Sequence, residues 1–144
     1  MVAMDKLIGK VDNDTYIIGH SLGCMAVIRY MERLPAGARI RGAMIVGGRV
    51  ETPKKMPDMD PDDREVLIKW IGTPIDWKKV LSHTDNFTGV FSDDDPITPK
   101  GESERFKKIV GGRVIMKHAM GHFEEETTET LPDVLDAVLE AFNS

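Results

Sequence analysis

A serine lies in a glycine-bounded motif, GHSLG, at positions 19–23 of the 144-residue sequence. An apolar run at 15–18 precedes the motif and indicates a buried strand, and helical periodicity follows at 24–34. A serine on such a strand-to-helix turn is lifted above the sheet, where its hydroxyl can attack a carbonyl carbon. Amides at the start of the following helix favour the developing oxyanion. The motif therefore predicts Ser21 as a nucleophile, although it also fits a turn whose serine only caps the helix.

Serine catalysis also needs a histidine base and a carboxylate that orients the base. In a sheet of this kind both residues follow later strands, in the order serine, acid, histidine. Asp93, Asp94 and Asp95 follow a predicted strand at 86–91, and His122 follows a later predicted strand. Loops at the carboxyl ends of parallel strands meet at one edge of the sheet, so these loops are expected to face the serine. From the residues alone the choice among the three aspartates stays open, and at least two are expected to be solvated turn carboxylates.

The other histidines have simpler interpretations. His20 is expected to point away from Ser21 and to pack or form a hydrogen bond beside the site. His83 falls in a loop without a partner pattern and is interpreted as a surface residue. His118 lies four residues before His122, a spacing that can bind a metal ion. A glycine between them argues against a helix there and no third ligand is evident, so no metal site is predicted.

Two further residues near these motifs have alternative roles. Cys24 is the single cysteine of the sequence and is expected to be a small buried core residue rather than a second nucleophile. Trp77 precedes the acid loop and is predicted to line the substrate pocket, with packing in the core as an equally supported alternative.

The elements that must position these residues alternate between short apolar strands and helical segments. Strands are predicted at 15–18, 43–46, 86–91 and 113–117, and helices at 4–11, 24–34, 62–70, 77–81, 102–110 and 132–142. This alternation predicts a parallel sheet with helices on both faces. The sequence is thus expected to form a single α/β domain spanning residues 1–144.

Composition excludes several other classes of protein. With 19 basic and 24 acidic residues the net charge is −5, which argues against nucleic-acid and anionic-membrane partners. No apolar run approaches the roughly 18 residues of a transmembrane helix, and the first ten residues lack the pattern of a signal peptide. A single cysteine forms no internal disulfide and favours a reducing compartment. We therefore expect a cytoplasmic protein.

Taken together, the motifs resemble those of the small α/β-hydrolases of the YdeN and retinoblastoma-binding-protein-nine type, called the serine hydrolase family. The resemblance covers nearly the whole chain, in order, and is carried by residues 16–23 (YIIGHSLG), 45–48, 74–80, 92–99 and 121–123. It implies a three-layer α/β-hydrolase-like sandwich around a mostly parallel sheet of about four strands.

The resemblance also implies the roles of individual residues. Ser21 would be the nucleophile, and His122 the general base and then acid. Asp95, directly before Pro96, would be the orienting carboxylate. The backbone N–H of Leu22 would be one oxyanion donor. The implied activity is carboxylesterase-like hydrolysis of small acyl esters through an acyl-enzyme, with no cofactor.

The family normally has a strand, a glycine-rich loop, a helix and a second strand before the serine motif, whereas this sequence starts just ahead of the motif's own strand. The resemblance therefore predicts an amino-terminally shortened fold without the loop that carries the second oxyanion donor, a loss of about 10²–10³ in rate. It also predicts an unpaired sheet edge at 15–18. Either a homodimer forms along this edge or the sequence is truncated. The alternative function is a weak or inactive hydrolase homologue that acts as a protein-interaction module.

Overall fold

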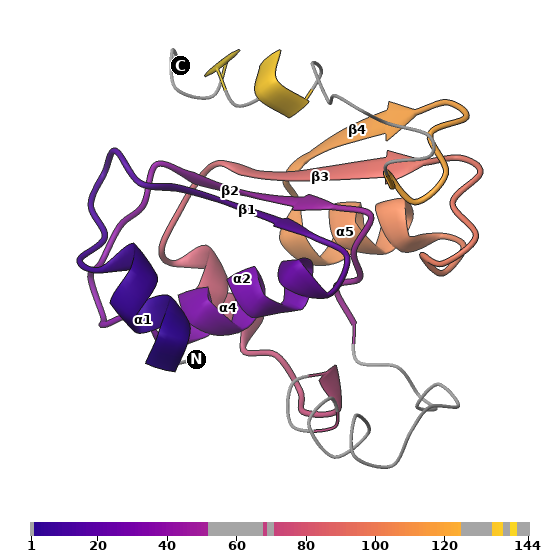
Figure 1. The fold of residues 1–144 in the computed structure, drawn as a ribbon. Coiled ribbons are helices and arrows are strands. Elements are labelled where there is room, and N and C mark those ends of the chain that lie inside the picture. Colours follow the sequence, from indigo (N-terminus) through magenta and orange to yellow (C-terminus); the bar gives the residue numbers. More distant parts are fainter. Residues whose placement is uncertain (1, 52–67, 69–70, 125–133, 137–138, 141–144) are drawn as a thin grey trace.

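The computed structural model describes residues 2–51, 68, 71–124, 134–136 and 139–140 (Figure 1). Its elements are α1 (Val2–Ile8), β1 (Tyr16–His20), α2 (Leu22–Arg33), β2 (Gly42–Val46), α4 (Trp77–Leu81), β3 (Phe87–Ser92), α5 (Glu102–Val110) and β4 (Arg113–Lys117). The four strands form one sheet in the order β1-β2-β3-β4, and every neighbouring pair is parallel. Within the described part of the chain, no helix is long and apolar enough to cross a bilayer.

The predicted strands and most predicted helices are confirmed, with shifts of up to three residues at their ends. The helix expected at 62–70 lies almost entirely outside the described residues. Of the helix expected at 132–142, residues 134–136 and 139–140 are described and are helical. The α/β class with a parallel sheet is therefore confirmed by the elements that the structure describes.

The sheet lies between two layers (Figure 1). Helices α1, α2, α4 and α5 cover one face, and the described helical residues near the carboxyl terminus lie over the other. Strand β2 is buried at all five positions because its side chains enter both layers. Ala43 and Ile45 pack with the helices, whereas Met44 and Val46 join a second cluster with Val134. The central strands are apolar on both faces for this reason.

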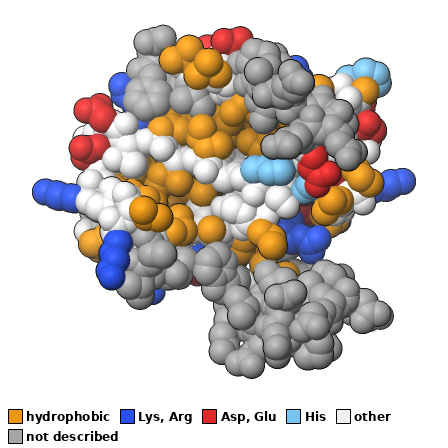
Figure 2. All heavy atoms as spheres, viewed as in Figure 1, with side chains coloured by type: hydrophobic (Ala, Val, Ile, Leu, Met, Phe, Trp, Pro, Cys, Tyr) orange, Lys and Arg blue, Asp and Glu red, His pale blue; other side chains and the backbone are white. Residues whose placement is uncertain are grey.

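Strand β1 lies at one edge of this sheet and pairs with β2, with Ile17 opposite Ala43. Ile18 on this edge strand is 47% exposed. Figure 2 shows hydrophobic side chains gathered across the middle of the face that looks toward the viewer in Figure 1, the side on which β1 lies. The homodimer expected along this edge stays a prediction.

The interpretation of His83 as a surface residue is wrong. Its side chain is only 1% exposed, and its Nδ1 donates a hydrogen bond to the carbonyl oxygen of Ala38 at 2.7 Å. The carbonyl oxygen of His83 in turn accepts from the Ile40 N–H at 2.9 Å. The segments that lead into β2 and β3 therefore bind each other at the amino-terminal ends of the strands, which buries a side chain whose sequence context shows no partner.

Candidate active site

The serine motif forms a sharp turn between β1 and α2. Ser21 has φ 53° and ψ −121°, a left-handed φ that non-glycine residues rarely adopt. Its N–H donates to the carbonyl oxygen of Val46 at 3.0 Å, which ties the turn to the end of β2. The Ser21 side chain makes no capping hydrogen bond to α2, so the alternative of a serine that only caps the helix is wrong. Such strain at a serine between a strand and a helix is typical of a nucleophile turn.

The two glycines of the motif play different parts in this turn. A Cβ atom on Gly19 would lie 2.4 Å from the carbonyl oxygen of Gly23, whereas a Cβ atom on Gly23 would meet nothing within 4 Å among the described residues. The close approach of β1 and α2 thus requires glycine at position 19. The motif has glycine at both positions, but in the described structure the crowding that requires glycine occurs at Gly19 and not at Gly23.

We therefore expect opposite results from two matched variants. Gly19→Ala should lower the free energy of unfolding by about 1–3 kcal/mol, because a backbone carbonyl has to move. Gly23→Ala should be neutral or stabilise by up to about 1 kcal/mol through helix propensity. Chemical denaturation of the two variants and the parent measures both values. Equal destabilisation by both substitutions would contradict the steric account.

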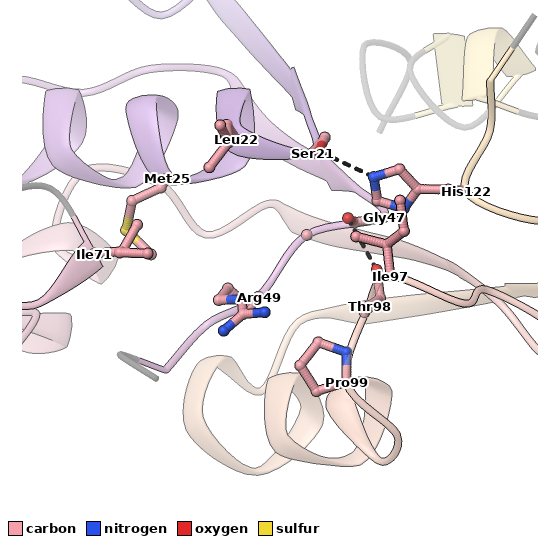
Figure 3. Close-up of a pocket in the computed structure, with 11 residues that line it drawn as sticks. Ser21, Leu22, Met25, Gly47, Arg49, Ile71, Ile97, Thr98, Pro99 and His122 are labelled. Carbon is pink, nitrogen blue, oxygen red and sulfur yellow. Dashed lines mark hydrogen bonds between the residues drawn. The ribbon is translucent and has the colours of Figure 1, made fainter. Parts of the chain in front are cut away.

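The structure brings Ser21, His122 and Asp95 together, and Figure 3 shows the hydrogen bond between Ser21 and His122. Oγ of Ser21 lies 2.9 Å from Nε2 of His122, and Nδ1 of His122 lies 2.9 Å from Oδ2 of Asp95. The side chains of His122 and Asp95 are 5% and 4% exposed. With the ring hydrogen on Nδ1, the carboxylate accepts from the histidine and Nε2 is free to accept the serine proton. The three side chains thus have the geometry for nucleophilic attack by the serine.

Asp95 is held by more than His122. Its Oδ1 accepts from the backbone N–H groups of Ile97 and Thr98 at 2.8 and 2.9 Å, and its Oδ2 accepts from the Thr98 hydroxyl at 2.6 Å. Burial disfavours ionisation of Asp95, but the hydrogen bonds from Thr98, His122 and Ile97 outweigh it and hold the pKa of this carboxyl below its ordinary value. Asp95 is therefore ionised at neutral pH.

Thr98 links the acid loop to the end of β2, a role that the sequence analysis missed. Its hydroxyl lies 3.0 Å from the carbonyl oxygen of Gly47 (Figure 3) and 2.6 Å from Oδ2 of Asp95. Gly47 has φ +56°, and a Cβ atom there would lie 3.4 Å from the ring of His122. The position of Thr98 three residues after an aspartate is the signal for such a turn.

Asp93 and Asp94 are exposed turn carboxylates, as expected, and each also accepts a backbone hydrogen bond. Asp93 accepts from the Ala119 N–H at 3.1 Å, and Asp94 accepts from the Gly121 N–H at 2.8 Å. Both bonds join the loop after β3 to the loop that precedes His122. The pKa of Asp94 is lowered by hydrogen bonds, first from the Ser92 hydroxyl and then from Gly121. The two exposed aspartates therefore hold the histidine loop in place.

The remaining histidines lie around this centre. His20 points to the backbone of His122, where its Nε2 donates to the carbonyl oxygen at 2.7 Å, so it is hydrogen-bonded beside the site as expected. His118 is exposed, and a hydrogen bond to Asp93 at 2.5 Å raises its pKa. His118 and His122 thus face different aspartates. The described residues contain no group of three side chains that could hold a metal ion.

A cavity of about 290 Å³ opens beside Ser21 and His122. Its wall is mainly apolar, and its described lining includes Leu22, Met25, Gly47, Gly48, Arg49, Ile71, Ile97, Thr98 and Pro99 (Figure 3). Leu22 is the first residue of α2, so its N–H has no acceptor within the helix. This amide can therefore donate to an oxyanion formed at the serine.

Two residues from the sequence analysis lie outside this cavity. The prediction that Trp77 lines the pocket is wrong for the described structure, because Trp77 is in α4 and packs against the core, with its ring 6.4 Å from that of Phe87. The alternative interpretation, core packing, applies. Cys24 is fully buried as expected, and burial raises the pKa of its thiol to about 12. A thiol that stays protonated is a poor nucleophile.

The parallel sheet, the strained serine turn and the Ser-His-Asp geometry define an α/β-hydrolase-like protein. A family model described as serine hydrolase matches residues 1–139, and the chain belongs to this family. The chain is 27% identical over 131 residues to the protein named "Putative hydrolase YdeN" of Bacillus subtilis. This match covers 90% of the chain but 65% of YdeN, so the chain spans slightly less than two thirds of that relative.

Solved structures give the same fold. The crystal structure of the ydeN gene product from B. subtilis superposes with a TM-score of 0.80 at 24% identity, covering 99% of this chain and 72% of that one. A structure described as "a putative aryl esterase" from Burkholderia cenocepacia superposes with a TM-score of 0.67 at 15% identity, covering 99% and 69%. The three-layer α/β-hydrolase-like architecture is thereby confirmed.

Proposed function

We propose that this serine hydrolase cleaves small acyl esters through a covalent acyl-enzyme on Ser21. The observation that carries the proposal is the continuous hydrogen-bonded line from Oγ of Ser21 through the ring of His122 to Asp95, beside an apolar cavity. Family membership supports hydrolysis as the reaction class. The ester as the bond cleaved rests on the apolar cavity and the resemblance set out above.

In the proposed mechanism, Oγ of Ser21 attacks the ester carbonyl carbon while Nε2 of His122 takes the hydroxyl proton. The carbonyl oxygen becomes an oxyanion that accepts from the Leu22 N–H. When the intermediate collapses, the bond to the alcohol oxygen breaks and His122 returns its proton to the leaving alcohol. Water then attacks the acyl-enzyme with His122 again as base, and the carboxylic acid leaves Ser21 free. Asp95 stays ionised and stabilises the imidazolium in both steps.

A fluorophosphonate probe tests the nucleophile directly. We expect the folded protein to be labelled once per chain, with the added mass on the peptide that contains Ser21, because the probe reacts with a hydroxyl activated by an adjacent base. The same preparation should release 4-nitrophenol from a short 4-nitrophenyl ester. A folded protein that is neither labelled nor active would refute the proposal and favour an interaction module without catalysis.

A further inference from the structure

Arg49 is a cation in an otherwise mainly apolar pocket. It follows β2, and among the described residues that line the cavity it is the one with a charged side chain other than the histidine of the site. In Figure 3 its guanidinium lies between the wall formed by Met25 and Ile71 and the wall formed by Pro99, away from the Ser21 hydroxyl. Arg49 is partly buried. Apolar pockets use a few such polar groups to orient a ligand.

The nearby carboxylates are directed toward another arginine. Glu102 is 4% exposed, and its Oε1 accepts from the Val50 N–H at 2.5 Å while its Oε2 lies 3.3 Å from Nη1 of Arg105. Glu51 also pairs with Arg105, at 3.6 Å. Burial raises the pKa of Glu102, and the charge of Arg49 contributes only a smaller, opposing effect. Arg49 has no hydrogen-bond or ion-pair partner among the residues that the structure describes.

Within the described part of the chain this partly buried guanidinium pairs with no carboxylate, which leaves its N–H donors available to a ligand. Its planar fork matches the two oxygens of a carboxylate, and such charge-assisted bonds are strong. We propose, on the basis of the esterase function above, that the preferred substrates are esters whose acyl chain ends in a carboxylate, with Arg49 binding that carboxylate while the ester carbonyl lies at Ser21. Arg49 would then be the residue that determines specificity.

The test compares 4-nitrophenyl monoesters of succinic, glutaric and adipic acids with uncharged acyl esters of the same chain lengths. We expect one length to span the pocket and to be preferred about 10- to 100-fold in kcat/KM over its uncharged partner, in line with a hydrogen bond to a charged group. Because the charged ester then loses the group that binds its carboxylate, Arg49→Met should remove this preference. Arg49→Lys should keep part of it.

Lys108→Met is the matched control, because it removes one positive charge from an exposed position on α5 outside the cavity. It should keep the full preference, and a loss equal to that of Arg49→Met would assign the effect to net charge. A wild-type protein that hydrolyses charged and uncharged esters equally would overturn the role of Arg49 but not the esterase function. A phosphate-bearing acyl ester preferred over every carboxylate ester would overturn the choice of carboxylate.

Binding to Ser21→Ala protein keeps the test independent of turnover. Calorimetric titration with the preferred monoester and its uncharged partner should show tighter binding of the anion by about 10-fold or more. The double variant Ser21→Ala/Arg49→Met should bind both equally. If the wild-type protein hydrolyses no ester, the esterase proposal fails, and this titration still decides whether the pocket selects a carboxylate.

Discussion

Replacing Ser21 with Ala is expected to lower kcat for a short 4-nitrophenyl ester by about 10⁴- to 10⁶-fold, to the background of the assay. The substitution removes the atom proposed to form the acyl-enzyme, while His122, Asp95 and the cavity stay in place. The hydroxyl makes no hydrogen bond that caps α2, so its loss does not remove a helix cap. Steady-state release of 4-nitrophenol measures the effect.

Ser103→Ala is the matched control for this variant. Ser103 lies on α5 and its hydroxyl donates to Glu104 at the surface, away from His122. The control should retain the parental kcat and fluorophosphonate labelling. If Ser21→Ala and the parent hydrolyse the ester at the same rate while both are folded, the nucleophile has been assigned wrongly.

Replacing Asp95 with Asn is expected to lower kcat by about 10⁴-fold through the tautomer of His122. The Ile97 and Thr98 amides both donate to Oδ1, so this position must remain an oxygen. The new amide NH₂ then takes the place of Oδ2, 2.9 Å from Nδ1 of His122. A donor at that point places the ring hydrogen on Nε2, which can no longer accept the proton of Ser21.

The measurement is kcat with the thermal midpoint recorded alongside it, because Asn keeps the size and most of the hydrogen bonds of Asp95. Asp85→Asn provides the control, since Asp85 is an exposed aspartate that pairs with Arg39. It should keep full activity. An Asp95→Asn variant with parental kcat would show that the carboxylate does not orient the base.

The order of the elements was predictable from the sequence because each strand is a short apolar run between glycines or turn residues. The serine turn was predictable for the same reason, since GHSLG lies between a strand and a helix. The choice of Asp95 among three adjacent aspartates was not, because spacing treats the three alike and only the resemblance favoured one. Their different roles depend on which loop each carboxylate meets, which is a tertiary property.

The errors share a physical cause. His83 and Trp77 were assigned from their neighbours in sequence, but one is buried beneath a distant turn and the other lies against a ring from β3. Arg49 was overlooked because a single arginine after a strand has no pattern. Its proposed role in binding a ligand follows from the described ion pairs, because Glu51 and Glu102 both pair with Arg105 instead. Contacts between segments far apart in sequence decide all three cases.

The left-handed backbone of Gly47 lies on the path by which the base reaches the serine. The serine follows β1 and the histidine follows β4, so three strand spacings, about 14 Å, separate the strands that carry them. The loop from β4 has to extend back over the ends of β3 and β2 to bring His122 to the serine. Gly47 directly follows β2 on this route, and its φ of +56° is one that glycine adopts without steric cost. A residue with no functional group thus provides the backbone turn beside which His122 lies.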